Sequence, residues 1–456
     1  MTFSPATLKS TLPAEDSVKR FWIALSGGLD SMVLLHAMAS LKLSVPVMAL
    51  HVNHQISSNS DNWQQQCALF CETLQIPFYA EKVAVTHAGR GLEDAARGAR
   101  YGVFERYLQL GDVLLTAHHA DDQAETLLLR LMRGAGPRGL AAIAHQRELG
   151  AGQLCRPLLA FSRAELQAYA EAQNLTWVED ESNLNSHYDR NFLRHKAVPI
   201  LRERWPQLSR RLQQTAELCA VNEGLLIELA AEDLAAADVR MERAGQSISL
   251  AALHQRSVAR RHNLLRHWLR EAELDLPEQS HLVQFQQQIM TGRADAEITL
   301  AWGNLTMHRY RERLYVLPRL NSVVQTQEPY DFVLSEAFGQ IPLGQGGSLN
   351  FEYINQAKDM NCLQANLPDL SLRWREGGER CQPAGRTHSQ TLKRLLQEYG
   401  LEPWWRAQLP LVFSGETLVA AGDLWVCKDF VAAPGQPGYR LAWQPQLPGC
   451  HSPSGS

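Results

Sequence analysis

Six residues near the start of the chain have the composition of a phosphate-binding turn. They lie between an apolar run at 21–25 and a second apolar stretch at 32–39, and they are Ser26, Gly27, Gly28, Leu29, Asp30 and Ser31. The two glycines let the backbone adopt positive φ and approach a ligand without a Cβ in the way. We expect Ser31 to cap the following helix, whose first N–H groups would face a bound anion. The alternative is a plain turn between a strand and a helix.

A second group of polar residues is rich in carboxylates. The run His118-His-Ala-Asp-Asp-Gln-Ala-Glu-Thr126 follows an apolar segment at 112–117. Acidic residues at a helix start are also favoured by the helix dipole alone. Capping a helix does not require two histidines together with Asp121, Asp122 and Glu125. Mg²⁺ prefers carboxylate oxygens as ligands. We therefore expect this group to help hold Mg²⁺ on a nucleotide.

Basic residues gather at several places that could bind a polyanion. Glu93, Arg97 and Arg100 have helical spacing, which equally fits a solvated, ion-paired helix face. Arg190 and Arg194 open a stretch, 186–215, that holds seven Lys or Arg residues and two acids. Residues 254–270 hold five arginines and no carboxylate, and residues 373–406 hold further arginines, Lys393 and three tryptophans. Such local patches favour contact with a phosphate backbone.

The composition is that of an ordinary globular protein. A chain of 456 residues is too long to fold around one hydrophobic core, so we expect two or three domains. A net charge of −4 means that any nucleic-acid site must be a local patch. No two of the eight cysteines form a C-x-x-C pair, which argues against a zinc ribbon, an iron–sulfur site or a redox dithiol. Because no secretory signal and no run of ~20 apolar residues occurs, we expect a cytoplasmic protein without a membrane span.

Strand-like and helix-like runs alternate over the first half of the chain and must position these residues. Strands are predicted at 21–25, 45–52, 77–85 and 112–117, and helices at 61–74, 92–110, 120–133 and 163–174. This alternation predicts an α/β domain with a doubly wound, mainly parallel sheet. Ligands bind beyond the carboxyl ends of such strands, where the 26–31 turn and the 118–126 group both fall. His51 and His54 follow the second strand, at an edge expected to accept adenine.

The remaining chain is expected to form two smaller domains. Residues 1–215 make the α/β domain, 216–320 a mostly helical domain, and 350–445 a small α+β domain. Turn residues at 320–347 predict a linker region, and the Pro-, Gly- and Ser-rich end at 445–456 predicts a disordered tail.

Taken in full, Ser-Gly-Gly-x-Asp-Ser at 26 resembles the PP-loop of the ATP pyrophosphatase superfamily, in which ATP is split between the α and β phosphates. Further segments resemble the tRNA(Ile)-lysidine synthetase family, and the resemblance covers most of the chain. In order, they are His-Val-Asn-His at 51, Gly-Leu-Glu-x-x-Ala-Arg-x-x-Arg-Tyr at 91, Ala-His-His-x-Asp-Asp-Gln-x-Glu-Thr at 117, Arg-Pro-Leu-Leu at 156, Glu-Asp-x-Ser-Asn at 179, Arg-Asn-x-x-Arg at 190, Arg-Glu-Gly-Gly-Glu-Arg at 375 and Pro-Trp-Trp-Arg at 403.

The resemblance implies a reaction with ATP and Mg²⁺. ATP activates carbon 2 of the wobble cytidine in a tRNA(Ile) with the anticodon CAU, which gives an adenylated base and pyrophosphate. The ε-amine of free L-lysine then displaces AMP, and the resulting lysidine changes codon recognition from AUG to AUA. The oligomeric state is left open, with a homodimer among the options.

The resemblance also implies roles for individual residues. Asp30, Asp121, Asp122, Glu125 and His118 would be catalytic, with Asp30 and Asp122 on the metal, although which carboxylate acts as base stays open. The turn at 26–31 would bind ATP together with His51 and His54. The residues implied for tRNA or lysine are Glu93, Arg97, Arg100, Arg190, Arg194, Arg380 and Lys393.

Three other functions share some of these features. A tRNA thiolation enzyme of the same superfamily often uses paired cysteines, and this sequence has no C-x-x-C pair. A small-molecule amide synthetase with the same loop would not need the basic segments of the carboxyl-terminal half. A non-catalytic RNA-binding protein would not need Asp30 and the 118–126 carboxylates intact. The combination favours base modification on a tRNA.

Overall fold

The computed structural model describes residues 2–57, 59–84, 92–178, 189–293, 298–319, 329–335, 339–343 and 347–445, without the side chains of 92–94. The predicted motif at 179–183 and the predicted tail after residue 445 lie outside these residues. The chain forms two compact units, Met1–Leu226 and Ile227–Ser456. The division into domains at 1–215, 216–320 and 350–445 stays a prediction.

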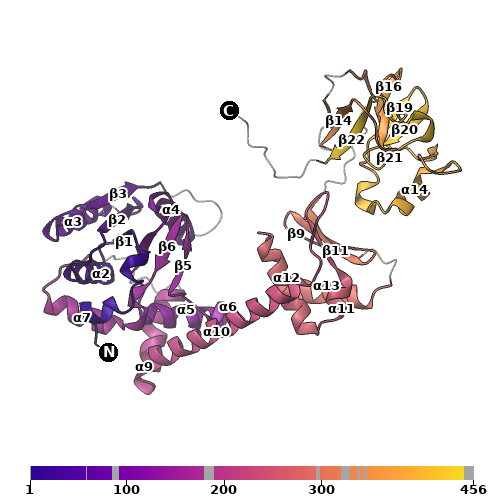
Figure 1. Cartoon of the computed structure of the whole chain (residues 1–456). Coiled ribbons are helices and arrows are strands. Elements are labelled where there is room, and N and C mark those ends of the chain that lie inside the picture. Colours follow the sequence, from indigo (N-terminus) through magenta and orange to yellow (C-terminus); the bar gives the residue numbers. More distant parts are fainter. Residues whose placement is uncertain are drawn as a thin grey trace. The chain divides into compact units, whose positions relative to one another are not determined.

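The first unit is built around a six-stranded sheet with the order β3-β2-β1-β4-β6-β5 (Figure 1). All neighbouring strands pair in parallel except β5, which runs antiparallel to β6. The predicted α/β fold with a doubly wound, mainly parallel sheet is therefore confirmed. The strands are β1 (Arg20–Ala24), β2 (Val47–Asn53), β3 (Phe78–Lys82), β4 (Asp112–Leu115), β5 (Gln146–Leu149) and β6 (Gly152–Cys155).

Helices cover both faces of this sheet, because the side chains of β1 alternate between two cores. Phe21 and Ile23 join one core, which also holds buried residues of α2, α3 and α7. Trp22 joins the second core, which holds Phe104 of α4. The helices are α1 (Pro5–Lys9), α2 (Leu29–Ser40), α3 (Ser60–Thr73), α4 (Leu92–Tyr107), α5 (Ala120–Met132), α6 (Pro137–Leu140), α7 (Arg163–Ala172), α8 (Asp189–Phe192), a π-helical turn (Leu193–Ala197), α9 (Val198–Arg204) and α10 (Leu208–Ala235).

β1 lies where the strand order changes direction. It pairs with β2 on one side and β4 on the other, so the residues that follow β1 and β4 emerge side by side at the carboxyl edge. Doubly wound sheets bind ligands at this kind of point. The arrangement brings together the two polar groups singled out above, with His119 Nε2 3.6 Å from Asp30 Oδ2.

The second unit begins with helices and a five-stranded antiparallel sheet of order β7-β8-β11-β10-β9. The helices pack on the sheet around the buried Leu264, Trp268 and Phe285. Strands β7 and β8 form in a stretch that was predicted to be helical, because Ile248 is buried and β8 pairs with β11. The elements are α11 (Leu250–His254), α12 (Val258–Glu271), α13 (Gln279–Thr291), β7 (Arg240–Met241), β8 (Gln246–Ser249), β9 (Thr299–Trp302), β10 (Leu305–Tyr310) and β11 (Arg313–Pro318).

The carboxyl-terminal part is β-rich, with sheets of order β12-β16-β19-β20-β21 and β13-β14-β22-β15 and a small β17-β18 pair. The linker predicted at 320–347 contributes two of these strands, because Phe332 and Ile341 insert into the core. The elements are β12 (Tyr330–Phe332), β13 (Gln340–Pro342), β14 (Ser348–Ile354), β15 (Cys362–Gln364), β16 (Leu370–Arg373), β17 (Arg380–Cys381), β18 (Gln390–Thr391), α14 (Leu392–Tyr399), β19 (Leu411–Ser414), β20 (Thr417–Ala421), β21 (Trp425–Val426) and β22 (Gly438–Gln444).

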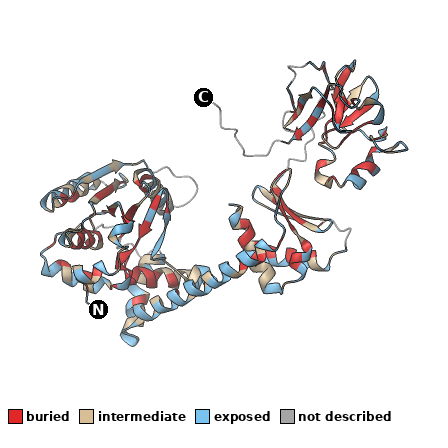
Figure 2. Cartoon of the chain, in the orientation of Figure 1, coloured by how far each residue is buried: buried red, intermediate tan, exposed pale blue. Residues whose placement is uncertain are grey.

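The tryptophans of the Pro-Trp-Trp-Arg segment serve packing. Trp405 is buried in the core of the carboxyl-terminal part. Trp404 stacks on His308 of β10, with ring centroids 4.6 Å apart, and its edge meets Tyr315 of β11. These contacts join the two parts of the second unit, and Figure 2 shows the buried residues of their strands in red. Among the described residues, no helix has the length and apolarity needed to cross a membrane.

Two of the five arginines in the basic stretch at 254–270 are paired with a buried carboxylate. Arg256 and Arg260 both donate to Asp233 of α10, a residue that is 1% exposed. Arg256 precedes α12 and Arg260 lies in its first turn, and both side chains reach the same carboxylate. The predicted cationic face is therefore smaller than the sequence indicates.

Replacing Asp233 by alanine is expected to destabilise the packing of α10 on α12 by about 2 kcal/mol, because two guanidinium groups lose their buried partner. Hydrogen–deuterium exchange of α12 measures this as a roughly thirty-fold faster exchange through local opening. The exposed Asp238, whose carboxylate also binds arginine, provides a matched Asp238→Ala control with a smaller effect. Equal protection of α12 in both variants would contradict this account.

Candidate active site

Hydrogen bonds within the chain fix the turn after β1, and Ser26 in this turn is exposed to solvent. Ser26 Oγ lies 3.0 Å from Ser31 Oγ, and Ser31 Oγ donates to the carbonyl of Gly28 at 2.9 Å. Gly27 accepts a hydrogen bond at 2.9 Å from the N–H of Val178. Ser26 itself is exposed, and the first N–H groups of α2 have no partners within the helix. The turn can therefore present backbone donors to an anion.

Ser31 does not cap α2, contrary to expectation. The helix begins at Leu29 with Gly28 as its N-cap residue, which places Ser31 in the first turn. Ser31 is 3% exposed and binds the turn internally. Its role in this structure is to fix the turn, while Ser26 remains available to a ligand.

Position 27 requires glycine. Its φ is +86°, and a Cβ there would lie 3.0 Å from Sγ of the buried Cys67. A Gly27→Ala substitution is expected to cost about 1–2 kcal/mol in backbone strain. Displacement of the turn should weaken ATP binding roughly tenfold, measured as KM for ATP. Gly415→Ala is a matched control, because Gly415 also has positive φ but no atom near its Cβ position. An unchanged KM in Gly27→Ala would contradict this role.

His119 organises the start of α5. As N-cap residue it accepts hydrogen bonds at Nδ1 from the N–H groups of Asp121 and Asp122. Its Nε2 lies 3.6 Å from Asp30 and 3.4 Å from Asp122 Oδ2. His119 therefore joins the two loops, whereas the histidine predicted to be catalytic was His118.

The charges around His119 shift its pKa, and they also shift the pKa of Asp122. Burial lowers the pKa of His119, but the carboxylates of Asp122, Asp30 and Asp121 outweigh burial and raise it above its ordinary value. Burial would raise the pKa of Asp122, but His119 and Arg190 hold it down at about 2. Asp122 is therefore ionised throughout the physiological range.

Two arginines close over Asp122 and Glu125. Arg190 donates to Asp122 Oδ1 at 2.8 Å and to Glu125 Oε2 at 3.0 Å. Arg194 donates to Glu125 Oε1 at 2.7 Å and to Asp122 Oδ1 at 3.0 Å. Asp122 and Glu125 lie three residues apart on one face of α5, and the arginines lie four apart on theirs. This arginine–carboxylate lattice joins four residues predicted to belong to the site.

Asp121 has different neighbours. Its carboxylate accepts from Arg202, from the Ser209 hydroxyl at 2.8 Å and from the Arg163 N–H at 3.2 Å. It therefore fastens α9 and the start of α10 to α5, whereas Asp122 and Glu125 share the arginine pair. The structure does not bring Asp121 into the lattice.

A second group of arginines surrounds Tyr101. Arg97 and Arg147 lie 5.0 and 5.1 Å from its ring centroid. The buried Arg156 donates to the Ala144 carbonyl, while its Nε has no partner among the described residues. Burial lowers the pKa of His118 to about 3, with Arg156, Arg190 and Arg97 adding to the shift. His118 is therefore neutral beside a region able to attract an anion.

His51, which lies in β2, and His54, which directly follows that strand, differ in environment. His51 is buried, and its Nδ1 lies 2.8 Å from the carbonyl of Leu25, directly before the turn. It therefore supports the end of β1. His54 is half-buried, and burial, Arg100 and His51 lower its pKa to about 4. His54 Nδ1 has no partner within the described part of the chain, which leaves it available to a ligand.

The predicted metal ligands can be tested against these contacts. Asp30 Oδ1 is buried without a partner among the described residues. Both oxygens of Asp122 already accept hydrogen bonds, from the His119 N–H and from the arginines. No group of three or more His, Cys, Asp or Glu residues suited to a metal occurs in the described ranges. Asp30 therefore fits Mg²⁺ that takes its other ligands from phosphate and water.

The remaining predicted residues lie on three elements, α4, β17 and α14. Glu93 and Arg100 belong to α4, and the side chain of Glu93 lies outside the described residues. Arg380 of β17 pairs with Thr391, the N-cap residue of α14, and Lys393 is in the first turn of that helix. Both basic side chains are exposed on this edge of the carboxyl-terminal part.

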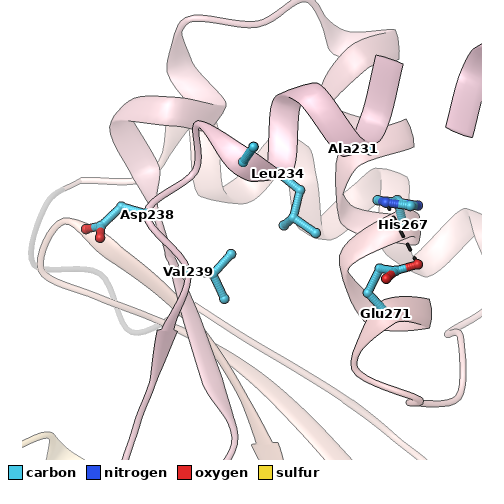
Figure 3. Close-up of a pocket in the computed structure, with 7 residues that line it drawn as sticks. Ala231, Leu234, Asp238, Val239, His267 and Glu271 are labelled. Atoms are coloured by element: carbon cyan, nitrogen blue, oxygen red, sulfur yellow. Dashed lines mark ion pairs between the residues drawn. The ribbon is translucent and has the colours of Figure 1, made fainter. Parts of the chain in front are cut away.

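A surface pocket of the second unit contains none of the predicted residues (Figure 3). On one side, His267 Nε2 lies 4.0 Å from Glu271 Oε1. Leu234 and Val239 provide an apolar wall. Because Asp238 on its rim is already bound to arginine, the pocket offers few free polar groups.

The sheet and its turn define a PP-loop domain, and the PP-loop family model matches residues 5–201. Two further models, the TilS substrate binding domain and the TilS substrate C-terminal domain, match residues 248–315 and 370–443. The chain belongs to the tRNA(Ile)-lysidine synthase family.

Curated relatives carry that name. The protein from Coxiella burnetii is 36% identical over 97% of this chain and 97% of its own length. The relative from Alkalilimnicola ehrlichii is 39% identical over 96% of each chain. The one from Shigella flexneri is 37% identical over 94% of this chain and 97% of its own. The similarity therefore extends over all parts of the molecule.

Three residues of the site were not singled out from the sequence. His119 was named only beside His118, although a residue directly before an acidic helix start is a natural N-cap. Arg156 was quoted within a motif without a role, and Arg202 was one of several basic residues. The four-residue spacing of Arg190 and Arg194 and the three-residue spacing of Asp122 and Glu125 are signals that could have indicated the lattice.

Proposed function

We propose that this enzyme joins free L-lysine to carbon 2 of the wobble cytidine of tRNA(Ile) with the anticodon CAU, by way of an adenylated base. Membership of the tRNA(Ile)-lysidine synthase family supports the overall reaction. The observation that carries the chemistry is the approach of Asp30, His119 and Asp122 at the mouth of the PP-loop. It places a phosphate-binding turn beside two carboxylate side chains and a histidine.

The turn would bind the phosphates of ATP through its N–H groups and Ser26. Asp30 would hold Mg²⁺, which neutralises charge on the phosphates as pyrophosphate leaves. His119 supports this arrangement by keeping the start of α5 and Asp30 together. His54, with its unpartnered Nδ1, would face the nucleotide base.

Lysine carries one carboxylate and two amines, and the site offers complementary charges. Asp122 and Glu125 would attract an ammonium group, while Arg97, Arg100 and the arginines around Tyr101 would attract the carboxylate or an RNA phosphate. Arg190 and Arg194 donate hydrogen bonds to Asp122 and Glu125 in this structure. If the amine of lysine binds these carboxylates, the two arginines must therefore share or release their hydrogen bonds. The wobble base must leave its stack to reach this point.

The second unit would hold the body of the tRNA. Arg380 and Lys393 are exposed on one edge of it and could contact phosphates. The cytoplasm, where tRNA and lysine are both present, would be the place of the reaction.

Product analysis tests this proposal. With ATP, Mg²⁺, lysine and a CAU transcript of tRNA(Ile), we expect AMP and pyrophosphate in equal amounts. A transcript in which the anticodon is changed to GAU is the matched control and should yield neither. Formation of ADP and phosphate, or equal turnover on both transcripts, would contradict the proposal.

A further inference from the structure

Two cysteines of the carboxyl-terminal part lie on adjoining strands. Cys381 is the last residue of β17, and Cys427 directly follows β21. Two backbone hydrogen bonds, of 2.8 and 3.0 Å, join residues 382–384 to residues 426–428, and Pro383 lies opposite Cys427 in this antiparallel pairing. Because side chains alternate along extended backbone, Cys381 and Pro383 share a face. The pairing therefore brings the two cysteine side chains to the same face of the strands.

The two thiols interact directly in a buried environment. Cys381 is 6% exposed and Cys427 is 4% exposed. The Cys427 S–H donates to the Cys381 sulfur, which lowers the pKa of Cys381 and raises that of Cys427. Burial raises the pKa of Cys67 and Cys71 to about 12, so those thiols keep their protons. Since a thiolate is the reactive form of cysteine, Cys381 is the nucleophile of its pair.

Trp425 supplies a donor to this pair. Its side chain is 3% exposed, and its Nε1 has no oxygen or nitrogen acceptor within the described part of the chain. The indole interacts with both cysteine side chains, and its N–H favours a negative charge on sulfur. A buried N–H without an acceptor is unfavourable, and a thiolate at Cys381 would provide one.

We propose that Cys381 and Cys427 form a site of reversible oxidation, at which a small hydroperoxide such as hydrogen peroxide converts the two thiols into a disulfide. The Cys381 thiolate attacks one peroxide oxygen, which gives a sulfenic acid and hydroxide, and the hydroxide takes up a proton to become water. The Cys427 sulfur then attacks the sulfenic sulfur. Its proton leaves with the displaced hydroxyl group as a second water. The two thiols lose two electrons, and the peroxide gains them.

The disulfide would tie β17 to the residue that follows β21. Arg380, the exposed neighbour of Cys381, also belongs to β17, so oxidation would restrict the strand that carries this basic side chain. The bond would close a loop over residues 381–427 and restrict the unfolded chain, which is stabilising. Because no step involves ATP, lysine or tRNA, this proposal does not depend on the proposed function.

Peptide mapping of the full chain tests the site. The chain is treated with a small excess of hydrogen peroxide, its remaining thiols are blocked with N-ethylmaleimide, and it is digested with trypsin. We expect the peptide 381–386 joined to the peptide 407–428, and dithiothreitol should separate them. Cys219→Ser is the matched control and should give the same joined peptides. Absence of this product, or an equal yield of bonds between other cysteines, would overturn the proposal.

Trapping and thermal melting test the two steps separately. In Cys427→Ser the sulfenic acid at Cys381 has no thiol to react with, so dimedone should label Cys381 and leave Cys67 unlabelled. Peroxide should raise the melting temperature of the carboxyl-terminal part of the unmodified chain by several degrees and leave that of Cys427→Ser unchanged. Unlabelled Cys381, or an unchanged melting temperature of the oxidised unmodified chain, would refute the proposal.

Discussion

Replacing Asp30 by asparagine is expected to lower the rate of lysidine formation about 10²–10³-fold, a loss typical when one charged group at a reacting centre is removed. Asp30 lies in the first turn of α2, with one buried oxygen unpartnered and the other close to His119. Asparagine keeps the shape of the side chain but removes the charge that would hold Mg²⁺. Pyrophosphate release measured with a saturating CAU transcript reports this step directly.

Asp16→Asn is the matched control, because Asp16 is an exposed aspartate of the same unit. Its rate of pyrophosphate release should equal that of the unmodified enzyme. Both variants should melt within a few degrees of the unmodified chain, which separates a chemical defect from unfolding. Full pyrophosphate release by Asp30→Asn would remove Asp30 from the proposed metal site.

The second large effect is expected from Glu125→Gln. Glu125 is 2% exposed, and its two oxygens accept three N–H groups from Arg190 and Arg194. The glutamine amide places N–H donors against the arginine N–H groups, and of the two carboxylates that bind both guanidinium groups only Asp122 remains. We expect a loss of about 2 kcal/mol in stability, since the arginines are partly solvated, together with weaker lysine binding.

Thermal melting and the KM for lysine measure the two parts of this prediction. Glu148→Gln, on the exposed edge strand β5, is the matched control and should change neither. A variant that melts lower but keeps its KM for lysine would show the lattice to be structural only. In that case the ammonium group of lysine would have to bind elsewhere.

The fold of the first unit followed from its sequence because strand and helix patterns alternate with regular spacing. The parallel sheet then placed the turn at 26–31 beside the residues after β4 without any knowledge of side chains. The limits of elements were less accurate. β3 ends at Lys82 and α4 at Tyr107, both short of the predicted ranges.

Directions of individual side chains were harder to predict than their positions along the chain. Asp121 and Asp122 are neighbours in sequence, yet the helix turns them about 100° apart, so one binds Arg202 and the other Arg190. Arg256 and Arg260 looked free because their partner, Asp233, is distant in sequence. Ser31 was expected to cap α2 because the helix start was placed too late.

Transfer of labelled lysine to tRNA tests the central claim most directly. The full chain is incubated with ATP, Mg²⁺, radiolabelled L-lysine and a tRNA(Ile) transcript with the anticodon CAU, and the tRNA is then recovered. We predict stable, ATP-dependent label at the wobble nucleotide, and none when Asp30 is replaced. Unlabelled tRNA from the active, ATP-cleaving enzyme would contradict the account.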